Sequence, residues 1–297
     1  MKSKDDFKWK IIANGVLIIF SLCAVLPFLL LVIGSFTDES WAVSNGYSFF
    51  PKVWSLDAYS YIFDQIALLG RGYLNTIIVT LIGTAASIVF TSLFAYALSN
   101  DKLPGVRIMN FLCIFTMLFS GGQVASYYVW SNIFHIRDTY LALILPNLMM
   151  NAFNVILVKN YYKTNIPAAL KESARIDGCS EFGIFIKIVT PLSIPINATI
   201  GLMTGLGYWN DWVNGLYYLT GRDGSKYYTI QIILNQINDS ISFLQKSATS
   251  AAAVGGDFPA ATARMAIAVA GVLPILIVYP FLQKYFVKGI TVGAVKE

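Results

Sequence analysis

The sequence has 297 residues, of which 56% are hydrophobic and only 12% are charged, and its formal net charge is +5. Soluble domains carry about 25% charged residues, so the composition excludes an ordinary soluble fold and indicates an integral membrane protein. The basic residues form no stripe, so the positive charge does not predict nucleic-acid binding.

Six apolar stretches are long enough to cross a bilayer as helices, which takes about 20 residues each. They lie at about 11–35, 73–99, 108–130, 140–158, 192–219 and 262–283. We therefore predict an all-α integral membrane protein with six transmembrane helices in a single domain that covers residues 1–297.

The first stretch follows a Lys-rich start, as the core of a secretory signal peptide would. Its apolar region is longer than such a core, and it contains no small-x-small cleavage pattern. We expect a retained transmembrane helix.

The second stretch carries a row of small, mostly hydroxylated residues. Such residues let helices approach closely, so the row favours packing over a direct functional role. Its members are Thr76, Thr80, Gly83, Thr84, Ser87 and Thr91.

Three amide side chains mark the fourth stretch. Asn147, Asn151 and Asn154 stand at i, i+4 and i+7, so a continuous helix would align them on one face that avoids lipid. This face can hold helices together through hydrogen bonds, or it can line a polar translocation path. The sequence leaves both interpretations open.

A polar segment at about 160–190 separates the fourth and fifth stretches. Pro167 suits a first helical position and Gly178 suits the residue beyond a helix end, which predicts a short helix at about 167–177. Ser180 can cap a second short helix, with Glu181 favourable at its positive end and Pro191 limiting it.

The first of these helices has the features of a docking surface. Its small residues, Ser173 and Ala174, would let another protein approach closely, and its charged residues offer partners for ion pairs. The charged residues are Glu172, Arg175 and Asp177.

This segment resembles the EAA loop of bacterial ABC importer permeases. The matching positions are Glu172, Ala174, Gly178, Ile188 and Pro191, and Ser173, Cys179 and Thr190 depart from the pattern by small changes. The resemblance implies a type I ABC importer permease fold with a cytoplasmic coupling loop at 160–190 that docks on an ATPase. The candidate ATPase-coupling residues are Glu172, Ser173, Ala174, Arg175, Asp177, Gly178, Phe182 and Phe185.

Aromatic and polar residues cluster toward the end of the fifth stretch. Trp and Tyr collect at membrane interfaces for general reasons, but a carboxylate and amides beside aromatic rings also suit a sugar, which offers hydroxyl groups and apolar C–H faces. Direct substrate contact and structural pairing near an outer gate both stay open. The candidates here are Trp209, Asn210, Asp211 and Asn214.

Motifs for catalysis are missing from the sequence. It contains no Gly-x-x-x-x-Gly-Lys-Ser/Thr phosphate loop and no His-Glu-x-x-His motif, and its single histidine is His135. We predict no catalytic site, no metal site and no cofactor on this chain, with ATP and Mg²⁺ bound by the partner ATPase.

The distribution of Lys and Arg predicts the orientation. With the N-terminus in the cytoplasm, the cytoplasmic segments hold 14 of these residues and the opposite side holds seven. We expect a multi-pass protein of the bacterial plasma membrane with both termini in the cytoplasm, and the segment at 160–190 on the same side.

Three further segments are similar to the carbohydrate-importer branch, the MalG-like permeases of polysaccharide and complex-oligosaccharide importers. They are Phe119–Gly122, Asp138–Tyr140 and the tail Phe286–Lys296, whereas Glu297 stands where Gly is usual. The resemblance covers nearly all of the chain and implies oligosaccharide import by alternating access. The partners it implies are a second homologous permease subunit, two ATPase subunits, an extracellular solute-binding protein and the lipid bilayer, with no nucleic acid.

Two other functions stay open. A permease for a non-sugar solute, such as a peptide or phosphate, would share the coupling loop. A membrane enzyme or scaffold is the second alternative, although an enzyme needs an intramembrane acid/base or metal constellation and Asp211 alone does not make one.

Overall fold

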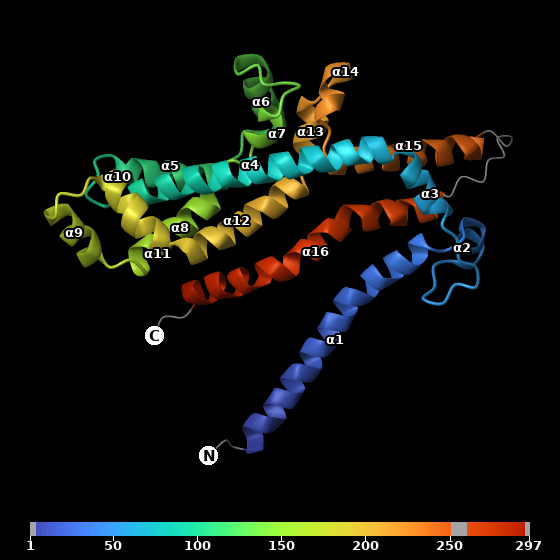
Figure 1. Cartoon of the computed structure of the whole chain (residues 1–297), viewed down its shortest axis with the longest axis horizontal. Helices are drawn as coiled ribbons and strands as arrows, with labels where there is room; N and C mark the ends of the chain where they lie inside the picture. Colours follow the sequence, from blue (N-terminus) through green and yellow to red (C-terminus); the bar gives the residue numbers. More distant parts are fainter. Residues whose placement is uncertain (1–3, 251–259, 295–297) are drawn as a thin grey trace. The chain divides into compact units, whose positions relative to one another are not determined.

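The computed structural model describes residues 4–250 and 260–294, and nearly all of its regular structure is helical (Figure 1). The predicted all-α class is therefore confirmed. The helices are α1 (Lys4–Ser35), α2 (Glu39–Asn45), α3 (Asp57–Asp64), α4 (Ile66–Ser99), α5 (Val106–Leu118), α6 (Gly122–Tyr128), the π-helix η1 (Val129–Ile133), α7 (Leu141–Ile144), α8 (Ala152–Thr164), α9 (Ala168–Ile176), α10 (Glu181–Ile184), the π-helix η2 (Phe185–Val189), α11 (Thr190–Leu192), α12 (Ile194–Trp209), α13 (Val213–Tyr218), α14 (Gly221–Gly224), the 3₁₀-helix η3 (Ser225–Tyr227), α15 (Ile230–Ser250) and α16 (Ala260–Ala294).

The chain folds into two compact units. The first lies within Met1–Leu68 and Leu234–Ile275, and the second within Leu69–Ile233 and Leu276–Glu297. The predicted coupling segment and the candidate substrate-path residues all belong to the second unit.

In the first unit, Glu39 caps a helix that is distant in sequence. Its carboxylate accepts hydrogen bonds from the backbone N–H groups of Ala261 (2.9 Å) and Thr262 (2.8 Å) and from the Thr262 hydroxyl (2.8 Å). The first N–H groups of a helix have no partner within it, and a negative charge is favourable at this end. Glu39 therefore fixes the start of α16 to the start of α2.

In the second unit, α4 and α12 pack through small residues. A Cβ on Gly83 would meet the Tyr208 ring at 2.5 Å, and a Cβ on Gly201 would lie 2.9 Å from the Ile88 side chain. Gly205 faces Thr84 at van der Waals distance. The predicted packing role of the second stretch is confirmed at Gly83 and Thr84, which lie against Tyr208 and Gly205 of α12.

Three helical segments among the described residues are long and apolar enough to cross a membrane, namely Lys8–Ser35, Ile66–Ser99 and Ala261–Val278. Two bent helix pairs raise this number to five if each pair is one span: Val106–Leu118 with Gly122–Ile133, bent by 118°, and Glu181–Leu192 with Ile194–Trp209, bent by 79°. The number six stays a prediction.

The predicted fourth span, 140–158, is not one continuous helix. Helix α7 ends at Ile144 and α8 begins at Ala152. Between them Pro146 offers no N–H group, and Asn147 adopts a left-handed backbone with φ +62°. The predicted alignment of three amides on one helical face is therefore wrong, because the helix is interrupted between them.

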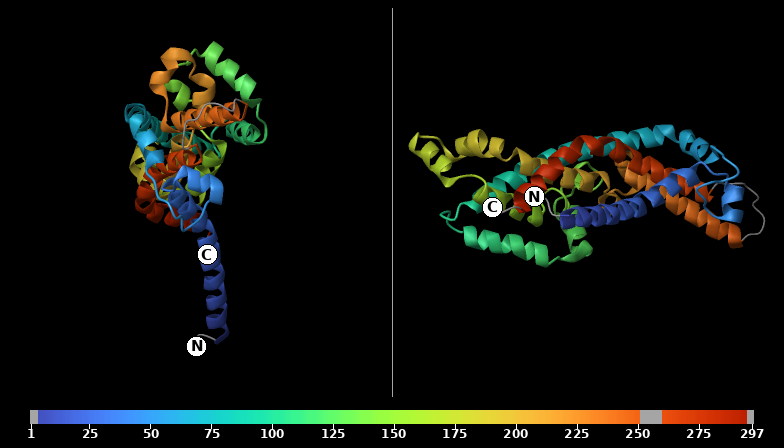
Figure 2. Two further views of the ribbon diagram at one scale, coloured as in Figure 1. Left: turned by 90° about the vertical axis from the view of Figure 1, so that its right-hand side faces the viewer. Right: turned by 90° about the horizontal axis from the view of Figure 1, so that it is seen from below.

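The predicted fifth span, 192–219, is interrupted as well. Helix α12 ends at Trp209, and α13 covers Val213–Tyr218 after a short break. Helices α9 and α10 lie at one end of the second unit in Figure 1 and in the right-hand view of Figure 2, next to the C-terminal end of α4. This placement gathers the predicted coupling residues at one end of the unit.

Candidate functional site

The coupling segment folds as a helix, a glycine turn and a second helix. Pro167 is the N-cap of α9 and not its first helical residue, so the helix begins at Ala168, one residue later than predicted. Asp177 is the C-cap. Gly178 has φ +79°, the left-handed conformation that ends many helices, and the Cys179 N–H donates to the Ala174 carbonyl (2.9 Å). The predicted turn at Gly178 is confirmed.

The second helical run begins where the sequence predicts. The Ser180 hydroxyl accepts a hydrogen bond from the Gly183 N–H (3.1 Å) and so caps α10. The run continues through η2 to Leu192, one residue beyond Pro191, so Pro191 lies inside the final turn. It is tolerated there because it lies in the first turn of α11, where proline needs no N–H partner.

The coupling segment has an outer face and an inner face. On the outer face, the Ile176 side chain is 86% exposed and that of Phe182 is 64% exposed. On the inner face, Ala174 and Phe185 are buried in the hydrophobic core beside α4 and α8. Ala174 therefore packs against its own chain and is not the open contact surface that its small size predicts.

Glu181 links three helices through one carboxylate. Its Oε1 accepts a hydrogen bond from Arg175 Nε on α9 (2.6 Å), and its Oε2 accepts one from the Tyr96 hydroxyl on α4 (2.8 Å). The bond to Glu181 raises the pKa of the Arg175 guanidinium above its ordinary value. The sequence predicts only a favourable charge at the start of α10, and nothing in it marks Tyr96 as the second partner.

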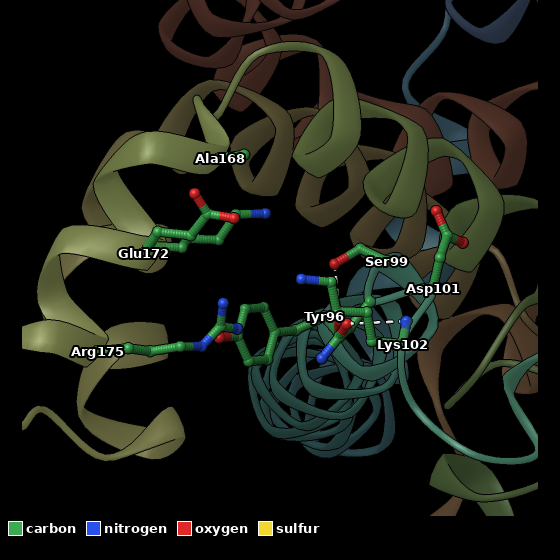
Figure 3. Close-up of a pocket in the computed structure, with 9 residues that line it drawn as sticks. Tyr96, Ser99, Asp101, Lys102, Ala168, Glu172 and Arg175 are labelled. Atoms are coloured by element: carbon green, nitrogen blue, oxygen red, sulfur yellow. Dashed lines mark hydrogen bonds between the residues drawn. The ribbon is translucent and has the colours of Figure 1, made fainter.

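A polar groove lies between α9 and the C-terminal end of α4 (Figure 3). Glu172 and Arg175 extend from α9 toward Tyr96 and Ser99. The nine lining residues are Tyr96, Ser99, Asn100, Asp101, Lys102, Ala168, Lys171, Glu172 and Arg175. Both signs of charge line its walls.

Asp101, which lines the groove, also forms an ion pair with a residue outside it. Lys163 on α8 contacts the Asp101 carboxylate at 2.6 and 2.8 Å, and this ion pair lowers the pKa of Asp101 below its ordinary range. The pair ties the loop after α4 to α8.

The break between α7 and α8 is supported by side chains of α12 and α13. The buried Tyr208 hydroxyl donates to the Ile144 carbonyl (2.7 Å), and Asn214 Nδ2 donates to the Pro146 carbonyl (3.1 Å). Interrupted helices within a membrane need partners of this kind for their free backbone groups. The break is therefore a fixed part of the fold.

The candidate substrate-path residues separate into two groups. Asn154 and Asn214 are buried, and Asn154 Nδ2 donates to the Thr204 hydroxyl (3.3 Å). Asn147, Asn151 and Asn210 are exposed, and Asn151 caps α8 by accepting from the Phe153 N–H (2.9 Å). The buried pair holds helices together. Of the exposed amides, Asn210 Nδ2 donates to the Leu206 carbonyl at the end of its own helix (2.9 Å).

Asp211 binds the start of α13 from the position just before its N-cap residue, Trp212. Asp211 Oδ1 accepts hydrogen bonds from the backbone N–H groups of Val213 (3.1 Å) and Asn214 (3.2 Å), which starts α13. Trp209 beside it is half-buried. The carboxylate that the sequence marks as a possible sugar contact thus has a structural role already.

Comparison with known proteins gives one family. The model of the family described as binding-protein-dependent transport system inner membrane component matches residues 88–292. The chain is 43% identical to the polygalacturonan/rhamnogalacturonan transport system permease protein YtcP of Bacillus subtilis (strain 168), over 95% of this chain and 96% of that protein.

A second relative and a solved structure also match this chain over nearly their whole lengths. The chain is 29% identical to the arabinooligosaccharides transport system permease protein AraQ of Halalkalibacterium halodurans, over 99% of each. It also resembles the crystal structure of a bacterial ABC transporter involved in the import of the acidic polysaccharide alginate, with a TM-score of 0.78, 29% identity, and coverage of 96% of this chain and 99% of that one.

Proposed function

Because the chain belongs to the family of binding-protein-dependent transport system inner membrane components, we propose that it is the permease subunit of an ABC importer for oligosaccharides or polysaccharide fragments. A component of such a system works with a solute-binding protein and an ATPase and is not itself an enzyme. The observation that carries the proposal is the helix, glycine turn and helix at Ala168–Leu192, with an apolar outer face.

The finer assembly is part of the proposal. A second homologous permease subunit completes the pathway, and two ATPase subunits bind ATP and Mg²⁺ on the cytoplasmic side, so this chain holds no cofactor. Both termini lie in the cytoplasm of the bacterial cell, as the excess of Lys and Arg on that side supports. The solute-binding protein delivers the sugar from the opposite side.

The ATPase contacts the outer face of the coupling segment. Ile176 and Phe182 provide apolar contacts, and the exposed Ser173 and Asp177 provide polar ones. Glu172, which is exposed and lines the groove beside α4, adds a negative charge next to this face. Ala174 and Phe185 do not contact the ATPase. They support the outer face by packing α9 and α10 against the core. ATP-driven closure of the ATPases then tilts the attached helices, and the pathway opens alternately to each side.

The solute passes the interrupted helices. Exposed amides at Asn147, Asn151 and Asn210 offer both donors and acceptors, which suit sugar hydroxyl groups. The names of the relatives, which concern polygalacturonan, rhamnogalacturonan and arabinooligosaccharides, favour a sugar over a peptide for this chain as well.

Transport by the complete system tests this proposal. The permease is reconstituted with its partner subunits and binding protein, and uptake of labelled galacturonic acid oligomers, arabinooligosaccharides and peptides is measured beside ATP hydrolysis. We expect sugar uptake in the wild type. Gly178→Trp and Glu172→Lys should insert normally but lose uptake at retained ATP hydrolysis, because a side chain at φ +79° distorts the turn and the charge reversal disturbs docking.

A matched charge reversal on another exposed site serves as the control. Asp64→Lys, at the end of α3, should transport normally. Normal sugar uptake by Gly178→Trp and Glu172→Lys would contradict the coupling role, and uptake of peptides alone would contradict the sugar assignment.

A further inference from the structure

The contacts of Glu181 indicate a role in transmitting movement within the importer. This inference rests on the proposed function and goes beyond it. Its two carboxylate oxygens are divided between Arg175 on α9 and Tyr96 on α4, while its backbone belongs to α10. One side chain thus contacts both α9, the helix proposed to dock on the ATPase, and the membrane-spanning helix α4. Tyr96 and Glu181 are 85 residues apart in the sequence, so the link joins distant parts of the chain.

The backbone between α9 and α10 consists of the C-cap Asp177, Gly178 in the left-handed conformation, Cys179 and the N-cap Ser180. The N–H groups of Gly178 and Cys179 bond back to carbonyls of α9 (3.1 and 2.9 Å), so neither of these backbone bonds joins α9 to α10. Glycine is the residue with the widest range of allowed backbone angles. A force applied to α9 could be absorbed by rotation at Gly178. A side-chain link that bypasses the glycine would prevent this loss.

The far end of the link is firmly held. The Tyr96 ring packs against Phe185 at 5.3 Å between ring centroids and against the buried Tyr162 at 6.5 Å. Its hydroxyl reaches beyond these rings to Glu181. Displacement of the carboxylate is therefore passed to α4 at a point where the helix is packed in the core of the unit.

Stability alone does not explain the arrangement. The side chains of Arg175 and Glu181 are 39% and 55% exposed, and ion pairs with such exposure contribute little to folding. A link that contributes little to stability but joins the docking helix to a span is suited to transmission of movement.

We propose that Glu181 is a positioning residue of the transport cycle, which clamps α9 through Arg175 to α4 through Tyr96 so that movement of the ATPase reaches the span and is not lost at Gly178. The clamp acts during coupling, and docking of the ATPase itself depends on the outer face described above.

Two conservative variants test the clamp in the complete reconstituted importer. Tyr96→Phe removes one hydroxyl and keeps the ring, and Glu181→Gln removes the charge at nearly constant size. The quantity measured is the amount of galacturonic acid oligomer imported per ATP hydrolysed, together with the amount of ATPase that copurifies. We expect each variant to lower this ratio by about threefold to tenfold, the range that the typical net contribution of one exposed hydrogen bond implies, with unchanged copurification.

The double variant and a control decide the interpretation. Because both changes break the same link, the ratio for Tyr96→Phe with Glu181→Gln should be no lower than for Glu181→Gln alone. Lys163→Gln, which breaks an ion pair of equal length to Asp101, should leave the ratio unchanged. Unchanged ratios in the two single variants, multiplied effects in the double variant, or loss of the copurified ATPase would each overturn the clamp. If the wild type imports none of the sugars, the proposed function fails instead.

Discussion

Removal of a single oxygen atom from Tyr208 tests how the break between α7 and α8 is held. The Leu148 N–H, which would bond to the Ile144 carbonyl in a continuous helix, bonds instead to the Pro146 carbonyl (2.7 Å). The Tyr208 hydroxyl replaces it (2.7 Å). Tyr208→Phe leaves the ring in place but takes away this donor from a buried carbonyl.

The magnitude follows from the burial of both partners. A buried polar group without a partner costs about 1–3 kcal/mol in proteins generally. Side-chain hydrogen bonds in a membrane protein average about 0.6 kcal/mol and reach about 1.7 kcal/mol. Tyr208 is 1% exposed and Ile144 is 7% exposed, so water cannot replace the hydroxyl. We expect a loss of about 1–2 kcal/mol, or about fivefold to thirtyfold in the unfolding equilibrium.

The assay is unfolding of the purified protein in mixed micelles by increasing mole fraction of SDS, followed by helical circular dichroism. Tyr128→Phe on α6 is the matched control, because Tyr128 is largely exposed and its change should stay within about 0.5 kcal/mol. If Tyr208→Phe changed the free energy of unfolding no more than this control, the Ile144 carbonyl would not depend on the hydroxyl, and the reasoning would be refuted.

Three further predictions concern other parts of the chain. Gly83→Leu should destabilise the second unit by about 2 kcal/mol or more in the same SDS titration, because the side chain would overlap the Tyr208 ring. Asn154→Leu should lower stability more than uptake, because Asn154 is buried, and Asn151→Ser, which keeps a cap on α8 but removes the exposed amide, should lower uptake more than stability; equal losses of both quantities in both variants would contradict the division. Glu39→Gln should weaken the start of α16 by about 1–2 kcal/mol, visible as faster amide hydrogen exchange in its first turn, and unchanged exchange would argue against the cap.

The sequence predicts the coupling segment well because its signals are local. A proline before the helix, a glycine after it and a serine before the next helix each act through their own backbone, and Gly178 and Ser180 occupy the predicted positions. The role of Ala174 could not be predicted in the same way. Whether a small residue faces a partner or its own core depends on how α9 packs, and this is decided by residues far away in sequence.

The interruptions of the fourth and fifth spans could not be predicted from the sequence either. Apolar composition reports that a segment prefers lipid or protein interior, but it does not report whether the helix is continuous. The break at Pro146 is stable because Tyr208 and Asn214, more than 60 residues later, satisfy the carbonyls around it. The sequence therefore predicts a polar face from the amides of the fourth stretch, but it does not reveal that the helix is interrupted between Asn147 and Asn154.

The π-helix η2 determines which side chains of the coupling segment point toward the core. A π turn contains one residue more than an α turn, so every side chain after it is rotated by about 100° relative to an uninterrupted α-helix. Ile184 and Val189, which are five residues apart, both reach the core with this spacing. Deletion of the exposed Ile186 would restore α geometry and bring a different set of side chains to the core, so insertions and deletions here should be far less tolerated than substitutions of exposed residues.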